Sequence, residues 1–343
     1  MVERVRVVRA DRGAVLVLPA TSAGDGSGPD EGGAAAERVP LDRDGTLPLL
    51  DARSHDVPSV GDWLVLADGH ARIEPRRTAL VRDSAGRTAQ TQTLAANVDV
   101  VLVAEHLDPD PDLGRVERLL TLAWRSGATP VVVLTKADLV PDPDGMTADV
   151  AAVALGVDVH AVSVVRDEGL DPVRALLTPG ATLVVVGPSG AGKSTLVNAL
   201  AGREVMATGG RRADGRGRHT TTHRELVPLS GGAVLIDTPG LRGIGLVADA
   251  DALATTFADV DALVRSCRFS DCTHEREPGC AVLEALALGD LSERRYDSWR
   301  RLEREAAYQE RRADARLAAA ERARWKRITQ DHRRGRGPGA PRP

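Results

Sequence analysis

The sequence contains few aromatic residues, few cysteines and few lysines, and each shortage narrows the possible classes of protein. Phenylalanine, tryptophan and tyrosine make up 2% of the 343 residues, and Trp63 is the only one of them before residue 80. Base stacking therefore cannot dominate nucleic-acid binding in that segment. The three cysteines are odd in number and clustered, which argues against a disulfide framework.

The sequence also lacks a long hydrophobic run and a strong excess of either charge. No apolar run approaches the ~20 residues needed to span a bilayer, and the first residues are too charged for a signal peptide. We therefore expect a cytoplasmic protein with no membrane partner, and a monomer. The net charge is −4, so any contact with nucleic acid must use local basic patches.

Lysine is rare, and two of the three lysines lie in motifs. Of 45 basic residues only Lys136, Lys193 and Lys326 are lysines. Lysine persists where a compact ammonium is hard to replace by a planar guanidinium. These two positions are therefore candidates for specific chemistry.

Lys193 lies in a stretch that reads as strand, glycine-rich turn and helix. The apolar residues 183–186 predict a buried parallel strand, and Leu196 opens a helical pattern. The turn fits G-x-x-x-x-G-K-S, in which backbone N–H groups and a helix N-terminus hold phosphates. Lys193 is expected to reach the β and γ phosphates and to assist catalysis, and Ser194 to hold Mg²⁺. The expected nucleotide-binding residues are Gly187, Pro188, Ser189, Gly190, Ala191, Gly192, Lys193, Ser194 and Thr195.

A second motif predicts recognition of guanine. Residues 130–134 read as a buried strand that runs into Thr135-Lys136-Ala137-Asp138. The Asp138 carboxylate can accept hydrogen bonds from guanine N1–H and the 2-amino group, a pair that adenine cannot offer, and the stem of Lys136 would pack along the base. Ser163 follows the next short strand, where GTPases support the base. A polar turn without a ligand is the alternative.

Two later segments predict sensors of the γ-phosphate. Residues 203–222 form a glycine- and arginine-rich loop that ends in His219-Thr220-Thr221-Thr222. Thr221 is expected to join Ser194 and Asp237 around Mg²⁺ when GTP is bound. Asp237-Thr238-Pro239-Gly240 ends a strand, and the Gly240 N–H would sense the γ-phosphate.

The sequence lacks the glutamine that positions the attacking water in Ras-like enzymes. Leu241 stands where a Ras-like enzyme has a glutamine that positions water, and leucine cannot orient water. Intrinsic hydrolysis should therefore be slow. His219 is our candidate for orienting or polarising the water, with a structural loop histidine as the alternative.

All three cysteines lie with one histidine inside 14 positions. Three thiolates and an imidazole match a closed tetrahedral zinc site of the structural kind. Buried free thiols with a surface histidine are the alternative. The expected ligands form the pattern C-x4-C-x-H-x5-C and are Cys267, Cys272, His274 and Cys280.

The chain as a whole predicts several domains. Short strands in the first 80 residues favour an oligonucleotide-binding (OB) barrel, with a structural barrel as the alternative; residues 22–36 read as a mobile loop and 76–96 as a polar connector. A helix is expected at 115–125, another at 169–177 and a long one at 291–328. The expected units are an all-β OB barrel at 1–80, an α/β P-loop GTPase domain at 95–248, a mainly helical zinc domain at 249–330 and a basic disordered tail at 331–343.

The guanine motif precedes the P-loop, whereas ordinary GTPases have the reverse order, so the GTPase domain is predicted to be circularly permuted. Its second switch would then lead directly into the zinc-bearing region and could transmit the γ-phosphate state to it. With the cysteine spacing and the stretches 60–63 and 95–99, this order resembles the ribosome small subunit-dependent GTPase A family. The resemblance implies GTP/GDP, Mg²⁺ and one zinc ion as cofactors. It also implies the small ribosomal subunit and its rRNA as partners, late in subunit maturation, with hydrolysis stimulated by the subunit.

Two other functions compete with this one. The P-loop also fits guanylate kinase-like enzymes, which leave residues 135–138 and 237–240 unexplained. An RNA-associated binding module with incidental hydrolysis is the second, and the basic residues beyond 322 fit either an RNA patch or a solvated face.

Overall fold

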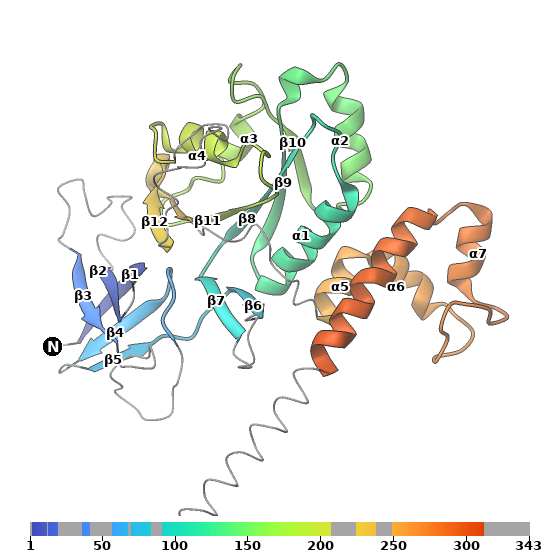
Figure 1. Cartoon of the computed structure of the whole chain (residues 1–343), viewed down its shortest axis with the longest axis horizontal. Coiled ribbons are helices and arrows are strands. Elements are labelled where there is room, and N and C mark those ends of the chain that lie inside the picture. The colour runs from blue at the N-terminus through green and yellow to red at the C-terminus, as the bar shows by residue number, and fades with distance from the viewer. Residues whose placement is uncertain are drawn as a thin grey trace, which may run out of the picture.

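The computed structural model describes residues 2–11, 13–19, 36–41, 57–67, 70–83, 91–206, 224–237 and 249–311. Within these residues, eleven strands form one continuous sheet and two more form a separate hairpin. Figure 1 shows strands at one side of the molecule, an α/β region in the middle and helices at the other side. No helix of the described part is long and apolar enough to cross a bilayer.

The central α/β region is a mostly parallel sheet in the order β10-β9-β8-β11-β13-β12, in which only β12 runs antiparallel to its neighbour. The inner strands β8, β9, β11 and β13 are rich in Val or Leu because both of their faces are buried. The strands are β8 (Val100–His106), β9 (Thr129–Thr135), β10 (Asp158–Ala161), β11 (Thr182–Val186), β12 (Arg224–Pro228) and β13 (Val234–Asp237).

Alternate residues of these strands enter two different cores. On β8, Val101 and Val103 pack with the helices α1 and α2, whereas Leu102 packs with α3 and α4 on the other face. This period of two is what a doubly covered sheet requires. The helices are α1 (Leu113–Ser126), α2 (Pro143–Ala151), α3 (Asp171–Arg174) and α4 (Lys193–Ala201), with short 3₁₀ turns η1 (Ala137–Leu139) and η2 (Ser230–Gly232).

The predicted strands of the first 80 residues are present and run antiparallel in the order β3-β2-β1-β4-β5. Their apolar faces form a small core of their own, including Val7, Val17 and Leu64. The described pairings do not include a bond between β3 and β5 that would close a barrel. The strands are β1 (Glu3–Asp11), β2 (Ala14–Pro19), β3 (Glu37–Pro40), β4 (Trp63–Ala67) and β5 (His70–Ile73); nearly all of the expected 22–36 loop lies outside the described residues.

The first strand joins this N-terminal sheet to the central one. β1 pairs with β2 along one edge, and on the other edge first with β4 and then with β12, where Arg9 lies opposite Glu225. The N-terminal strands therefore continue the central sheet through the strand that follows residues 207–223.

The predicted polar connector at 76–96 is wrong. It contains a β-hairpin of β6 (Ala79–Asp83) and β7 (Thr91–Ala96). Thr, Gln and Arg side chains hid the pattern, because only Leu80, Leu94 and the alanines that follow are buried. The helix expected at 169–177 is also shortened to the single turn of α3.

Residues 60–63 and 95–99, two of the stretches on which the family resemblance rests, meet between the N-terminal strands and the central sheet. A Cβ on Gly61 would lie 2.1 Å from the Ala96 carbonyl oxygen, so only glycine fits there. The Asn97 amide donates to the Gly61 carbonyl at 3.0 Å. Arg76 donates two hydrogen bonds, at 2.7 and 2.8 Å, to the fully buried Asp62. These contacts hold the two segments at one fixed distance.

The C-terminal region is helical. Helices α5 (Ala250–Thr256), α6 (Ala258–Arg265) and α7 (Ala281–Leu288) precede a long helix at 293–311, the described part of the one expected at 291–328. Asp249 and Cys280 accept hydrogen bonds from the first turns of α5 and α7 respectively. Apolar residues of these helices, including Phe257 and Leu302, belong to the same core as α1.

Candidate nucleotide and metal sites

The P-loop turn has the close backbone approach that its glycines permit. Gly187 has φ +148°, and a Cβ there would lie 2.1 Å from the Ala104 carbonyl oxygen of β8. Gly192 has φ +69° and caps the N-terminus of α4. A Cβ at Gly190 would meet no atom within 4 Å. The turn therefore leaves open space beside a helix N-terminus, which suits an anion.

Lys193 folds back over this turn. Its ammonium donates to the Gly187 carbonyl at 2.9 Å and also to the Pro188 carbonyl. The positive charge is thereby held against the carbonyls of the loop that is expected to bind the β and γ phosphates. Ser194 is half-buried in the first turn of α4, and Thr195 beside it is exposed.

The guanine-motif residues lie at the same edge of the sheet as the P-loop, because β8, β9, β10 and β11 are parallel and their carboxyl ends meet there. Ser163 follows β10, is fully buried, and its hydroxyl donates to the Asp138 carboxylate at 2.7 Å. One oxygen of Asp138 is thus oriented by a neighbouring loop. The arrangement leaves its other oxygen for a donor pair of the kind found on guanine.

Thr135 ties the guanine motif to the P-loop. Its hydroxyl donates to the Ala191 carbonyl at 3.0 Å, with the Glu105 carbonyl 3.3 Å away. Its side chain is buried, and Gly192 lies against it. A threonine therefore supplies a bridge between the two motifs although it lacks the amide of the commoner asparagine.

The structure places only some of the residues expected around Mg²⁺. Asp237 ends β13, which is parallel to β11, so it lies at the same sheet edge as Ser194. The remaining candidates His219, Thr221 and Gly240 lie outside the described residues, as do Leu241 and the basic tail.

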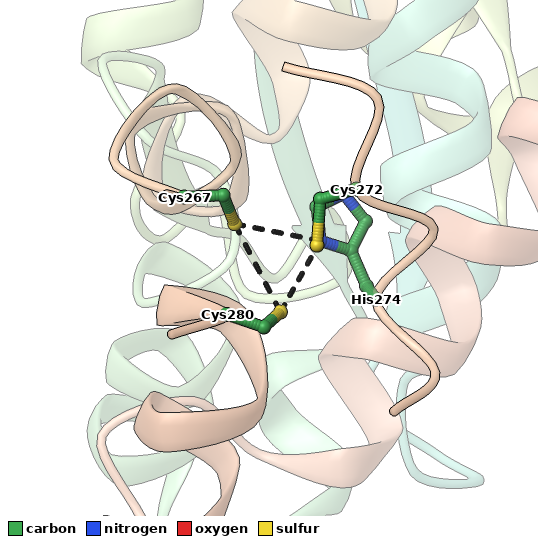
Figure 2. A group of neighbouring side chains, drawn as sticks. All are labelled: Cys267, Cys272, His274 and Cys280. Carbon is green, nitrogen blue, oxygen red and sulfur yellow. Dashed lines mark hydrogen bonds between the residues drawn. The ribbon is translucent and has the colours of Figure 1, made fainter. Parts of the chain in front are cut away.

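The four predicted zinc ligands come together. Figure 2 shows the four side chains converging from separate turns of the chain. Their ligand atoms all lie within 4.8 Å of one another. His274 Nδ1 lies 3.6 Å from Cys267 Sγ and 3.4 Å from Cys280 Sγ, and the two sulfurs are 3.9 Å apart. Tetrahedral zinc with bonds of about 2.0 and 2.3 Å requires separations of roughly 3.6 and 3.8 Å, so the donor set fits this ion.

The surroundings of the cluster favour the ligand forms of His274 and Cys267 but not of Cys272, because burial raises the pKa of Cys272 to about 11. Burial lowers the pKa of His274, which favours the neutral imidazole that binds metal. Burial raises the pKa of Cys267, but hydrogen bonds from the Val282 and Ala281 backbone outweigh it, so the pKa lies below its ordinary value. The sulfur of Cys280 accepts a hydrogen bond from the Leu283 backbone N–H, in the first turn of α7, at 3.5 Å.

The cluster is anchored to the long helix at 293–311. The Tyr296 hydroxyl donates to the His274 carbonyl at 3.1 Å, and the Trp299 ring contacts the His274 ring edge-on at 5.9 Å between centroids. Such contacts fix the orientation of a metal-binding imidazole. The helix face that carries Tyr296, Trp299 and Leu302 therefore contacts the cluster as well as the core.

A buried arginine, Arg295, is one of the residues that connect this helix to the central domain, and no sequence pattern predicted it. Arg295 is 3% exposed and donates to Glu117 of α1 at 2.8 Å and to Asp259 of α6 at 2.9 and 3.1 Å. Its guanidinium stacks on Phe257 at 4.3 Å. The sequence contains many arginines, and Arg295 differs from most of them by its burial against the buried Glu117. The burial of a single charged residue on an amphipathic helix cannot be read from the sequence.

Comparison with known proteins supports this architecture. Residues 73–247 match the family model described as RsgA GTPase. The protein named small ribosomal subunit biogenesis GTPase RsgA of Streptomyces avermitilis is 52% identical over 280 residues, which cover 79% of this chain and 75% of that protein. The protein of that name in Opitutus terrae is 47% identical over 295 residues, with 81% and 80% covered.

Two solved structures share the fold. YjeQ from Thermotoga maritima matches with a TM-score of 0.61 and 23% identity, over 90% of this chain and 99% of that chain. YloQ, described as a circularly permuted GTPase, matches with a TM-score of 0.59 and 24% identity, over 90% and 96%. Motif order, strand order and these matches define a circularly permuted P-loop GTPase fold. The chain belongs to the RsgA GTPase family.

Proposed function

We propose that the chain hydrolyses GTP to GDP and phosphate and acts in biogenesis of the small ribosomal subunit, whose rRNA it contacts. This proposal rests on the contact between the guanine motif at 135–138 and the P-loop at 187–194. Asp138, oriented by Ser163, lies at the sheet edge where Thr135 bonds the P-loop. A base reader and a phosphate cradle fixed to each other suit one guanine nucleotide, and the relatives named for small-subunit biogenesis support the partner.

The proposed mechanism assigns each step to side chains of this chain. Lys193 neutralises the developing phosphate charge, and Ser194, Asp237 and Thr221 would hold Mg²⁺, which would supply further positive charge at the phosphates. The Gly240 N–H contacts the γ-phosphate. His219 orients the attacking water, since Leu241 cannot. The four-residue cluster would hold a structural zinc ion, because four protein ligands would leave no coordination position open.

We retain the predicted division into four parts, with an OB barrel at 1–80, the GTPase domain at 95–248, the zinc domain at 249–330 and a basic tail at 331–343. The β1 to β12 pairing means that the first two share a sheet. A monomer is proposed.

The decisive test is GTP hydrolysis by the full chain alone and with purified small ribosomal subunits, with ATP as the control. We expect a slow basal rate that subunits raise at least about tenfold, and no ATP turnover. Equal rates with and without subunits would contradict the proposed partner. Turnover of ATP at the GTP rate would contradict the base-reading role of Asp138.

A further inference from the structure

The carboxylate of Glu105, a residue outside the recognised motifs, is buried beside the sheet edge where guanine is expected to bind. Glu105 ends β8 and is fully buried. Arg115 of α1 donates two hydrogen bonds to it, at 2.7 and 2.9 Å, and the His106 backbone N–H donates a third at 3.1 Å. A buried carboxylate is unfavourable unless it is paired and hydrogen-bonded in this way. The pair therefore fixes the distance between the end of β8 and the start of α1.

The loop between Glu105 and Arg115, whose two ends this ion pair joins, binds the ammonium of Lys136. The Lys136 ammonium donates to the Asp108 carbonyl at 3.0 Å, and Asp108 lies in the loop between Glu105 and Arg115. The loop is further held by His106, whose Nδ1 lies 2.9 Å from the Pro109 carbonyl oxygen. A carbonyl can fix an ammonium only if its own loop is fixed.

We propose that the Glu105–Arg115 ion pair is a positioning device for Lys136 in guanine-nucleotide binding, an inference that rests on the proposed function. The pair holds the 106–112 loop so that the Asp108 carbonyl anchors the Lys136 ammonium, and the anchored tip keeps the lysine stem beside the place where the base would bind. Lysine has a flexible four-carbon stem, so an anchor at its tip orders the side chain before the nucleotide arrives.

A purely structural role for the pair would act differently. It would lower the free energy of unfolding and weaken binding by the same factor whatever residue stands at 136. Positioning acts only through the ammonium, so its effect must vanish when the ammonium is absent. The two roles are therefore separated by a double-mutant cycle.

The experiment measures the Kd of the full chain for GDP in four variants: wild type, Glu105→Gln, Lys136→Met and the double variant. Lys136→Met keeps an apolar stem and removes only the anchored tip. We expect Glu105→Gln to raise the Kd about five- to tenfold in the wild-type background and less than twofold in the Lys136→Met background. Arg115→Gln should reproduce the first effect if Glu105→Gln does not fold.

Arg118→Gln is the matched control, because Arg118 lies on the same helix and pairs with Glu305 away from the loop. Its Kd should stay within twofold of wild type. Equal fold-changes for Glu105→Gln in both backgrounds, or no change in the wild-type background, would overturn the positioning role while leaving the proposed function intact. A wild-type chain that binds ADP as tightly as GDP would overturn both.

Discussion

The Thr135 hydroxyl connects three segments at the nucleotide end of the sheet. It lies 3.0 Å from the Ala191 carbonyl of the P-loop and 3.3 Å from the Glu105 carbonyl of β8. Threonine stands here in place of the asparagine that is commoner in this guanine motif, so a side-chain amide is missing. The geometry instead gives the threonine a bridging role, and the side-chain hydroxyl is what performs it.

Thr135→Val should therefore raise the Kd for GDP about tenfold, equivalent to about 1.4 kcal/mol. Valine has the same shape, but it leaves the Ala191 carbonyl without its donor in a buried place, a loss of about 1–3 kcal/mol. Thr135→Ser keeps the hydroxyl and is the control, with a Kd near that of wild type. Titration with a fluorescent GDP measures both, and equal values for the two variants would refute the bridge.

Candidate residues for the nucleotide and zinc sites can be identified in the sequence because both motifs depend on local spacing. The spacing of Gly187, Lys193 and Ser194, and of the cysteines and His274, is itself the signal. The partner of Lys136 could not be predicted, because it is the backbone carbonyl of Asp108, and every residue has a carbonyl.

Among the elements, α1 lies between the nucleotide site and the C-terminal helices. Its first turn bears Arg115, which pairs with Glu105, and its second bears Glu117, which accepts from Arg294 and Arg295 of the long helix. One rigid helix thus contacts both regions. Burial lowers the pKa of Arg295, but hydrogen bonds with Asp259 and Glu117 outweigh it, so the pKa lies above its usual value and the guanidinium stays charged.

Glu117→Gln should destabilise the docking of the 293–311 helix. The substitution leaves two arginines short of a buried counter-charge, a change that costs about 3–5 kcal/mol when one partner of a buried pair is removed. Amide hydrogen exchange should rise across 293–311 and α5, and the Tm should fall. Glu303→Gln breaks a half-exposed pair with Arg300 on the same helix and should change stability by less than about 1 kcal/mol. Unchanged exchange in Glu117→Gln would contradict the docking role.

The β6–β7 hairpin and the β1 to β12 junction were not predicted from the sequence, because neither has a local apolar pattern. The β6–β7 hairpin buries few side chains, so its polar composition resembles a connector. The β1 to β12 junction rests on backbone hydrogen bonds between Arg9, Ala10, Arg224 and Glu225, which are charged or small residues with no apolar alternation. Pairing between strands more than 200 residues apart leaves no local pattern in the sequence. The buried strands β8, β9 and β11, in contrast, are recognisable as apolar runs.

In the whole molecule, the permutation predicts a route from the second switch into the C-terminal region, since residues 238–248 directly precede α5. The described residues add a second route. It runs from the zinc cluster through Tyr296 and Trp299 to the long helix, then through Arg295 to Glu117 on α1. The C-terminal region therefore contacts the central domain on the helix that also carries the Glu105 partner.

Removal of zinc tests whether the cluster organises this region alone. Without metal, three thiols and an imidazole within 4.8 Å of one another lose the ion that holds them together, and a structural zinc site contributes directly to folding free energy. A chelator that competes for zinc should lower the Tm and raise hydrogen exchange in 258–311. The Kd for GDP, measured below the new Tm, should stay within about twofold, because the Thr135, Lys136 and Lys193 contacts involve none of these residues. Addition of zinc should reverse the changes. A large loss of GDP affinity on chelation would instead show that the cluster supports the nucleotide site through α1.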